Sequence, residues 1–468
     1  MVEETYVFSS KAKGKLITIM VVGLVLTAFG IFGVSQGWWD PGKVDGHHAE
    51  SHAVINENNW VADHHGDHEE RHTDRHHAEG DHVDHEVHSG EGHGEHHGYS
   101  FWKRVKADLW HNSLYFIGIS IIGVFFYAIN YVAWAGWSAS INRVFLSLGS
   151  YLPVGGIILI VVFFFTYHDI FHWTHDGIME EGSSNYDAII ASKAWYLNFP
   201  FYIARMFVYI IGWIVFWLFM RQQAEREDLN GGLLHHNRLI NLSAGFLVFF
   251  GVSSSMSAWD WAMSIDTHWF STMFGWYVFA SWFVSGLSAI TLLVIGLKKA
   301  GYLKIVNAEH LHDLGKFMFA FSIFWTYVWF SQFILIWYSN IPEESVWFVE
   351  RMYLNMGNYA PIFILNLVIN FLFPFFFMMT RDAKRYPVLL QVAAVAILIG
   401  HWFDFYLMVM PGVLKEHGGL NLGNLFLELG IAMIFAGIFI FCVLLGLSRI
   451  SLIPKNHPFI QESINHHT

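Results

Sequence analysis

The stretch STMFGWYVFASWFVSGLSAITLLVIGL, residues 271–297, contains no charged side chain. A helix that crosses a bilayer needs roughly 20 mostly apolar residues, so this stretch is long enough to span. Comparable stretches recur along the 468-residue chain, and most of them are bounded by Trp, Tyr or charged residues. We predict ten membrane-spanning helices with the approximate limits 14–36, 112–136, 146–167, 199–220, 238–259, 271–297, 315–339, 360–380, 387–410 and 423–448.

The composition supports lipid as the main solvent of the chain. Hydrophobic residues make up 54% of the sequence and charged residues only 14%, whereas soluble globular proteins have about 25% charged residues. The single cysteine, Cys442, argues against an internal disulfide and a cysteine-ligated iron–sulfur cluster. There is no basic stripe, so we expect no affinity for nucleic acid. The sequence therefore predicts an all-α integral membrane protein without a redox centre of its own.

The formal net charge of −12 belongs to one segment. Between Asp40 and Gly98 there are 15 acidic and 3 basic residues, a difference of −12, together with 15 of the 29 histidines. We interpret this segment as a solvated acidic, His-rich loop. Weak binding of zinc or nickel and proton buffering are the alternatives, but the irregular spacing does not indicate a structural metal site.

Basic residues are distributed unevenly between the two sides of the predicted helices. With the N-terminus in the cytoplasm, 16 of the 26 Lys and Arg residues fall on cytoplasmic segments, as the positive-inside rule requires. We therefore expect both termini in the cytoplasm and the His-rich loop on the outer side.

A weak internal duplication is one interpretation of the spans. The motif Trp259-Asp260-Trp261 ends the fifth span, and the similar motif Phe403-Asp404-Phe405 lies in the ninth. Motifs four spans apart are expected of two parallel four-helix repeats. Chance similarity between aromatic-rich helices explains the pattern equally well. The predicted division is 1–39 (first helix), 40–111 (His-rich loop and amphipathic lead-in), 112–270 and 271–410 (two four-helix bundles), and 411–468 (tenth helix and tail).

Ionisable side chains inside the spans are the candidate functional groups, because each costs roughly 2.5–3.5 kcal/mol to insert. Nearly all of them fall in the outer half, and the inner halves read as almost purely apolar. Carboxylates and imidazoles relay protons when their pKa values lie near neutrality; a quinone-head pocket and simple hydrogen bonding between helices are the alternatives. Only His168 and His401 could face each other across helices, so haem b is not expected. The proton-pathway candidates are His168, Asp169, His172, Arg205, Asp260, His401, Asp404 and Glu428.

Residues 330–344 read FSQFILIWYSNIPEE and are followed by Trp347 and Arg351. This run resembles the signature of the large membrane subunits of bacterial alternative complex III, in the NrfD/PsrC-like polysulfide-reductase membrane-subunit family. The ten-helix plan extends the resemblance over nearly the whole chain, and the early first helix and long outer loop are closer to the ActF-type subunit than to the ActC-type. The His-rich insert has no counterpart in the general family. The motif positions are Ser331, Gln332, Trp337, Tyr338, Asn340, Pro342, Glu343, Glu344 and Arg351.

The resemblance implies a membrane subunit of a quinol:cytochrome c oxidoreductase that is not catalytic by itself. It implies no cofactor on this chain other than a quinone, with haem c and iron–sulfur clusters on partner subunits. The implied partners are an ActC-type paralogous membrane subunit, a multihaem cytochrome c, an iron–sulfur subunit, small membrane subunits, lipids and a terminal oxidase. The implied location is the bacterial inner membrane, with the His-rich loop in the periplasm.

Two functions of other classes remain open from the residues. A secondary transporter for a divalent metal or another ion would use the His-rich loop as a scavenger, but it needs ligands near the bilayer midplane. A purely structural anchor would only hold peripheral redox subunits.

Overall fold

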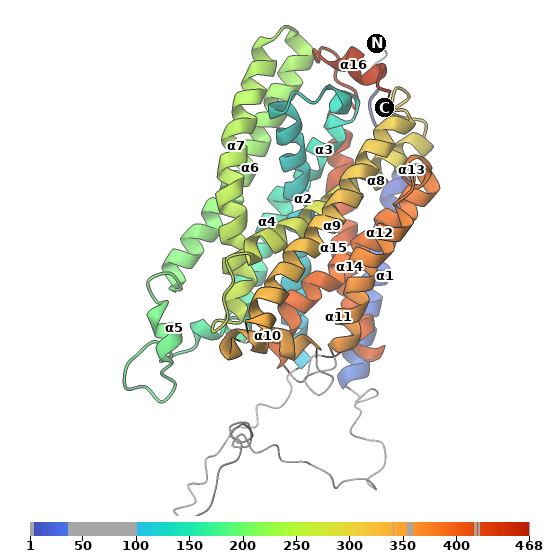
Figure 1. Ribbon diagram of the computed structural model, residues 1–468. Coiled ribbons are helices and arrows are strands. Elements are labelled where there is room, and N and C mark those ends of the chain that lie inside the picture. The colour runs from blue at the N-terminus through green and yellow to red at the C-terminus, as the bar shows by residue number, and fades with distance from the viewer. Residues whose placement is uncertain are drawn as a thin grey trace, which may run out of the picture. The chain divides into compact units, whose positions relative to one another are not determined.

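The computed structural model describes residues 4–35, 101–339, 341–352, 359–415, 419 and 422–467, and the acidic, His-rich loop with its predicted roles lies outside them. The described residues form helices and one isolated β-bridge, between Thr5 and Ser451 (Figure 1). Ten helical segments among them are long and apolar enough to cross a membrane. The predicted all-α membrane architecture with ten spans is therefore confirmed for the described part of the chain.

Most of these spans are single long helices, and three combine two or more helical pieces. The spans are α1 (Ser10–Ser35), α2 (Phe101–Val132), α3 (Asn142–Leu148) continued by η4 (Gly149–Tyr151) and α4 (Leu152–Ile170), α6 (Phe199–Asn230), α7 (Leu234–Trp261) with η6 (Met263–Ile265), α8 (Phe274–Lys299), α9 (Ala308–Tyr338), α11 (Ala360–Leu367) continued by η7 (Val368–Leu372) and α12 (Phe373–Phe377), α14 (Pro387–Leu414), and α15 (Leu422–Leu447). The connecting elements are η3 (Gly136–Ser140), η5 (His172–Thr174), α5 (Ala188–Ser192), α10 (Pro342–Met352), α13 (Arg381–Arg385) and α16 (Ile460–Ile464).

Two helices form the centre of the packed body. In α2 and α8, 89% and 83% of the most apolar stretch is buried, against 22% in α1, which packs on α15. Helix α2 packs on α4 and α7, and α6 packs on both of these; α8, α9 and α14 pack on one another, and α12 packs on α9 and α14. The two sets meet where α8 packs on α2 and α7 and where α14 packs on α2. The predicted domain boundaries and the duplication stay predictions.

Both described ends of the chain lie at the same end of the helices, here called the terminal face; α5 and α10 lie at the opposite, distal face (Figure 1). The segment 449–467 is held to the terminal face. Its Leu452 N–H donates to the Glu4 carbonyl over 2.9 Å, and its Ser463 hydroxyl donates to the Trp137 carbonyl over 2.7 Å. Burial lowers the pKa of His457, in the same segment, to about 4. Which face meets the cytoplasm stays a prediction.

The second span begins earlier than expected. The sequence predicts a lead-in up to residue 111 and a span from 112, but α2 is continuous from Phe101. Arg104, Asp108 and His111, assigned by sequence to the region before the span, are all fully buried in its first turns. They are accommodated there because α14 and α15 supply hydrogen-bond partners, which a lipid-facing helix end would lack.

Close packing of α8 on α2 gives a prediction about glycine. A Cβ on Gly286 would lie 2.3 Å from Cγ2 of Ile122, so Gly286→Ala is expected to overpack the centre and lower the free energy of unfolding by about 1–3 kcal/mol. Gly296, on the same helix, has nothing within 4 Å of its built Cβ, and Gly296→Ala is expected to be neutral or stabilising by up to about 1 kcal/mol. Unfolding of the detergent-solubilised protein by increasing SDS measures both; equal losses in the two variants would contradict the packing argument.

Candidate functional site

Asp404 is the centre of a polar cluster in the distal half of α14. Its Oδ1 accepts hydrogen bonds from the Tyr277 hydroxyl and, over 2.9 Å, from the Asn366 amide. Its Oδ2 accepts from the Ser281 hydroxyl at 2.6 Å and from the Trp325 indole N–H at 2.9 Å. The carboxylate is fully buried, and no described Lys or Arg forms a salt bridge with it. Neutral donors from three helices therefore hold this carboxylate.

His401 lies one turn before Asp404 on the same face of α14, as the spacing predicts. Its Nδ1 is 3.5 Å from Oδ2 of Asp404. The imidazole is fully buried, yet neither ring nitrogen has a hydrogen-bond partner among the described residues. Buried polar atoms are normally satisfied, so this unsatisfied imidazole beside a carboxylate is a place where a proton or a small polar molecule can be accepted.

The span that contains Asn366 is distorted next to this cluster. Residues Val368–Leu372 form a π-helical turn, and π-turns inside α-helices are frequent at functional sites. Pro374 explains the distortion, because it has no N–H for the carbonyl of Asn370 four residues earlier. Asn370 donates to Asn366 over 2.5 Å, and its buried Oδ1 has no hydrogen-bond partner among the described residues. A second side chain with an unsatisfied polar atom, after His401, therefore lies one amide away from Asp404.

A series of hydroxyls runs along α8 from the Asp404 cluster towards the terminal face. Ser281, Ser285, Ser288 and Thr291 are all fully buried. Ser285, Ser288 and Thr291 each donate to the carbonyl four residues earlier, while the Ser281 hydroxyl, which donates to Asp404, lies 3.0 Å from the carbonyl oxygen of Tyr277. The expectation that the inner halves of the spans are almost purely apolar is therefore wrong for α8. Sequence reasoning did not single out these residues, although their spacing of three and four places them on one helical face.

Asp260, at the distal end of α7, is buried in a different electrostatic setting. Arg205 of α6 binds both of its carboxylate oxygens at 2.9 Å, and the Tyr209 hydroxyl donates to Oδ2 at 3.1 Å. The guanidinium also packs on the ring of Tyr196, 3.9 Å from its centroid. Asp260 and Arg205 are thus brought together as a neutral ion pair, whereas no Lys or Arg in the described part of the chain pairs with Asp404.

Glu428 forms a third buried cluster near the distal face, where α15 meets α2 and α14. Arg104 donates to its Oε1 from Nε at 3.0 Å and from Nη2 at 2.5 Å, and both side chains are fully buried. The Tyr406 hydroxyl accepts from Arg104 at 3.0 Å and lies 3.3 Å from the same oxygen. Sequence reasoning found Glu428 but missed its partner.

Asp108 and His111 extend this cluster along α2, and neither was predicted. The Asn112 side-chain amide donates to Oδ1 of Asp108 at 3.0 Å, and its own Oδ1 accepts from the Trp402 indole N–H at 3.0 Å. His111 Nδ1 lies 3.4 Å from Asp108, and its Nε2 contacts the backbone carbonyl of Trp402 at 3.0 Å. Together with Arg104, these residues follow helical spacing (104, 108 and 111) directly before an apolar run. This spacing is the signal that would have placed them inside the helix.

The other predicted candidates lie at the surface. His168 and His172 are exposed, and Asp169 is partly exposed and forms an ion pair with Lys106. His168 and His172 both have ring contacts with His175, at 4.8 and 4.9 Å between centroids. Within the described residues, none of the three predicted candidates has a hydrogen bond or ion pair with the buried clusters.

The family-motif residues divide into buried and exposed positions at the distal face. Gln332 is buried and accepts from the Ser271 hydroxyl at 3.0 Å. Arg351 is buried, with Nη2 3.2 Å from Asp266, and stacks on Trp347 at 3.8 Å. Burial raises the pKa of the adjoining Glu350. Trp337 and Tyr338 are exposed and Ser331 and Glu344 are partly exposed, while Asn340 and the side chains of Pro342 and Glu343 lie outside the described residues.

The buried clusters of Asp404, Asp260 and Glu428 share the distal half of the helical body, and of these three carboxylates only that of Asp404 has no Lys or Arg partner among the described residues. Asp404 with His401 is therefore the strongest candidate functional site. No protein-family model matches the chain, and no curated protein matches it either.

Proposed function

We propose that the chain is a membrane subunit of a quinol:electron-acceptor oxidoreductase, and that Asp404 and His401 carry protons for that reaction. The observation that supports the proposal is the buried Asp404 carboxylate, bound by neutral donors and adjoined by an imidazole with two unsatisfied nitrogens. Such a pair can take up and release a proton without first breaking an ion pair.

Oxidation of a quinol to a quinone releases two electrons and two protons. The electrons leave through haem c and iron–sulfur centres of partner subunits, since a chain with one cysteine has no thiolate set for a cluster. The protons need groups that exchange them inside the membrane. The 3.5 Å between His401 Nδ1 and Asp404 Oδ2 is slightly longer than a hydrogen bond and closes with a small side-chain movement.

The α8 hydroxyls extend the proposed path beyond the carboxylate. Ser281 contacts Asp404 directly, and Ser285, Ser288 and Thr291 follow towards the terminal face. In the proposed orientation the terminal face lies in the cytoplasm and the distal face in the periplasm of a bacterial inner membrane, in keeping with the positive-inside rule. An ActC-type subunit, a multihaem cytochrome c and an iron–sulfur subunit are the proposed partners.

Purification from the native membrane in a mild detergent tests the proposal. We expect the chain to co-purify with multihaem cytochrome and iron–sulfur subunits, in a complex that oxidises a quinol and reduces cytochrome c. The haem absorption spectrum of the purified material and quinol-dependent cytochrome reduction are the measurements. A chain that purifies alone, or a complex without redox centres, contradicts the proposal and favours a transporter.

A further inference from the structure

A second group of buried ionisable side chains lies at the terminal face, on the opposite side of the protein from Asp404. Glu227 lies in the last turn of α6, His236 lies in the first turn of α7, and His457 belongs to the C-terminal segment. All three are buried, and one potential ligand atom from each lies within 4.8 Å of the others. Segments distant in the sequence therefore bring two imidazoles and one carboxylate to a single point.

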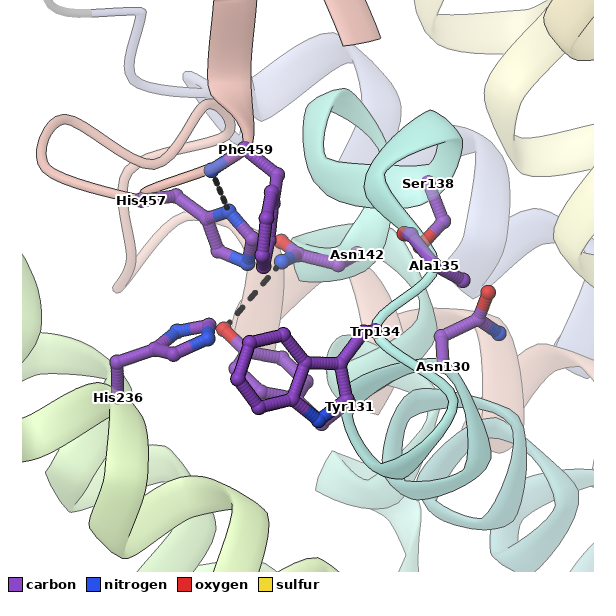
Figure 2. A pocket seen from close by; sticks show the side chains of 9 residues that line it. All are labelled: Asn130, Tyr131, Trp134, Ala135, Ser138, Asn142, His236, His457 and Phe459. Carbon is purple, nitrogen blue, oxygen red and sulfur yellow. Dashed lines mark hydrogen bonds between the residues drawn. The ribbon is translucent and has the colours of Figure 1, made fainter. Parts of the chain in front are cut away.

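Two of these residues, His236 and His457, line a small pocket. Figure 2 shows the rings of His236 and His457 on one side of it, with Tyr131 and Asn142 facing them from α2 and α3. The pocket is just large enough for one water-sized ligand. Asn142 is buried, and its Oδ1 has no hydrogen-bond partner among the described residues. An unsatisfied oxygen thus lies beside the two imidazoles.

Of the two adjacent carboxylates Glu227 and Asp228, Glu227 is less closely paired with Arg143 and can therefore serve as a ligand for a metal cation. Arg143 of α3 approaches Asp228 to 3.1 Å but Glu227 only to 3.8 Å, and Asp228 also accepts from the backbone N–H of Lys455. The nearer partners of Glu227 are the Tyr131 hydroxyl at 3.3 Å and Nδ1 of His236 at 2.9 Å.

We propose that Glu227, His236 and His457 bind one divalent transition-metal ion of the zinc class. Two imidazoles and one carboxylate with a fourth position left for water is a common zinc ligand set. Asn142 Oδ1 lines the pocket and can accept a hydrogen bond from that water. The backbone N–H of Phe459 donates to Nδ1 of His457 over 3.2 Å, so a metal at Nε2 requires the other tautomer and opens this contact (Figure 2).

The metal site would tie the C-terminal segment to α6 and α7. Its three ligand residues are not part of the His-rich loop sequence, whose 15 histidines would add any weak metal binding of their own to a measurement on the full chain. The experiment therefore compares variants that all retain this loop. Neighbouring His235 is an equally buried control, because it contacts Gln223 at 2.9 Å and Asn230 at 3.2 Å and is outside the cluster.

Equilibrium dialysis of the full-length, chelator-treated protein against Zn²⁺ tests the site. We expect His236→Gln and His457→Gln each to lose one tightly bound equivalent, with affinity at this site lowered by more than about 100-fold. His235→Gln should keep that equivalent. Equal Zn²⁺ binding by wild type and His457→Gln, or an equal loss in His235→Gln, would overturn the proposal.

A ligand replacement separates metal binding from a merely structural role of His457. With Co²⁺ as the probe, His457→Cys is expected to show a thiolate-to-cobalt charge-transfer absorption that wild type lacks. The only native cysteine, Cys442, lies inside α15 and gives little background. A folded His457→Cys protein without this absorption would also overturn the proposal.

Discussion

Asparagine in place of Asp404 is expected to lower quinol-driven turnover of the assembled complex by about 100-fold or more. General acid–base groups contribute roughly 10²–10⁴-fold to rates, and an amide cannot carry the proton. Asparagine also replaces one of the two acceptor oxygens by an NH₂ group, which cannot accept a hydrogen bond. A donor such as Trp325 or Ser281 therefore loses its acceptor. Stopped-flow quinol oxidation, with a pH dye to follow proton release from reconstituted vesicles, measures the effect.

Two controls accompany this variant. Asp169→Asn removes a carboxylate that was also a proton-pathway candidate but is partly exposed and paired with Lys106; we expect less than about twofold change. Asp404→Glu keeps the ionisable group and is expected to restore part of the turnover. Full turnover and normal proton release in Asp404→Asn would show that the carboxylate carries no proton in this reaction.

Removal of the Arg104 side chain is expected to have the largest effect on stability. Arg104→Met leaves the carboxylate of Glu428 buried without its cation, and breaking a buried ion pair from one side costs about 3–5 kcal/mol. The free energy of unfolding, measured by SDS titration of the detergent-solubilised protein, should fall by this amount. Retained stability would mean that water reaches Glu428.

The double variant Arg104→Met/Glu428→Leu distinguishes an unpaired charge from lost packing. A hydrophobic replacement of both partners is often neutral or stabilising, so we expect it to recover most of the loss. Lys106→Met, two residues along α2, breaks a partly exposed pair and should change stability by less than about 1 kcal/mol. A double variant no more stable than Arg104→Met alone would assign the loss to packing.

The ten spans were predictable because hydrophobic length is a local property of the sequence. The pairing of His401 with Asp404 on one face was also predictable, since residues three apart share a face of any helix. The donors to Asp404 were not, because Tyr277, Trp325 and Asn366 belong to three other helices and no local pattern records which helices meet.

The burial of Arg104 was missed for a different reason. Charged residues before an apolar run usually lie at the membrane surface, so the span was started after them. Its partner Glu428 is more than 300 residues away, and only tertiary packing reveals that the two charges compensate each other. Asp169, a proton-pathway candidate at the outer end of an apolar run, is only partly buried, because its helix ends at Ile170.

The contrast between Asp260 and Asp404 has an electrical consequence. A proton that reaches Asp404 from either face moves charge through part of the membrane potential, and a full crossing is worth about 2.3 kcal/mol per 100 mV. The Asp260 carboxylate is neutralised in place by Arg205 and makes no net contribution of this kind. In the proposed proton path, proton transfer to Asp404 should therefore depend on membrane voltage in proportion to the depth of this carboxylate, whereas the neutral Arg205–Asp260 pair should not respond to voltage.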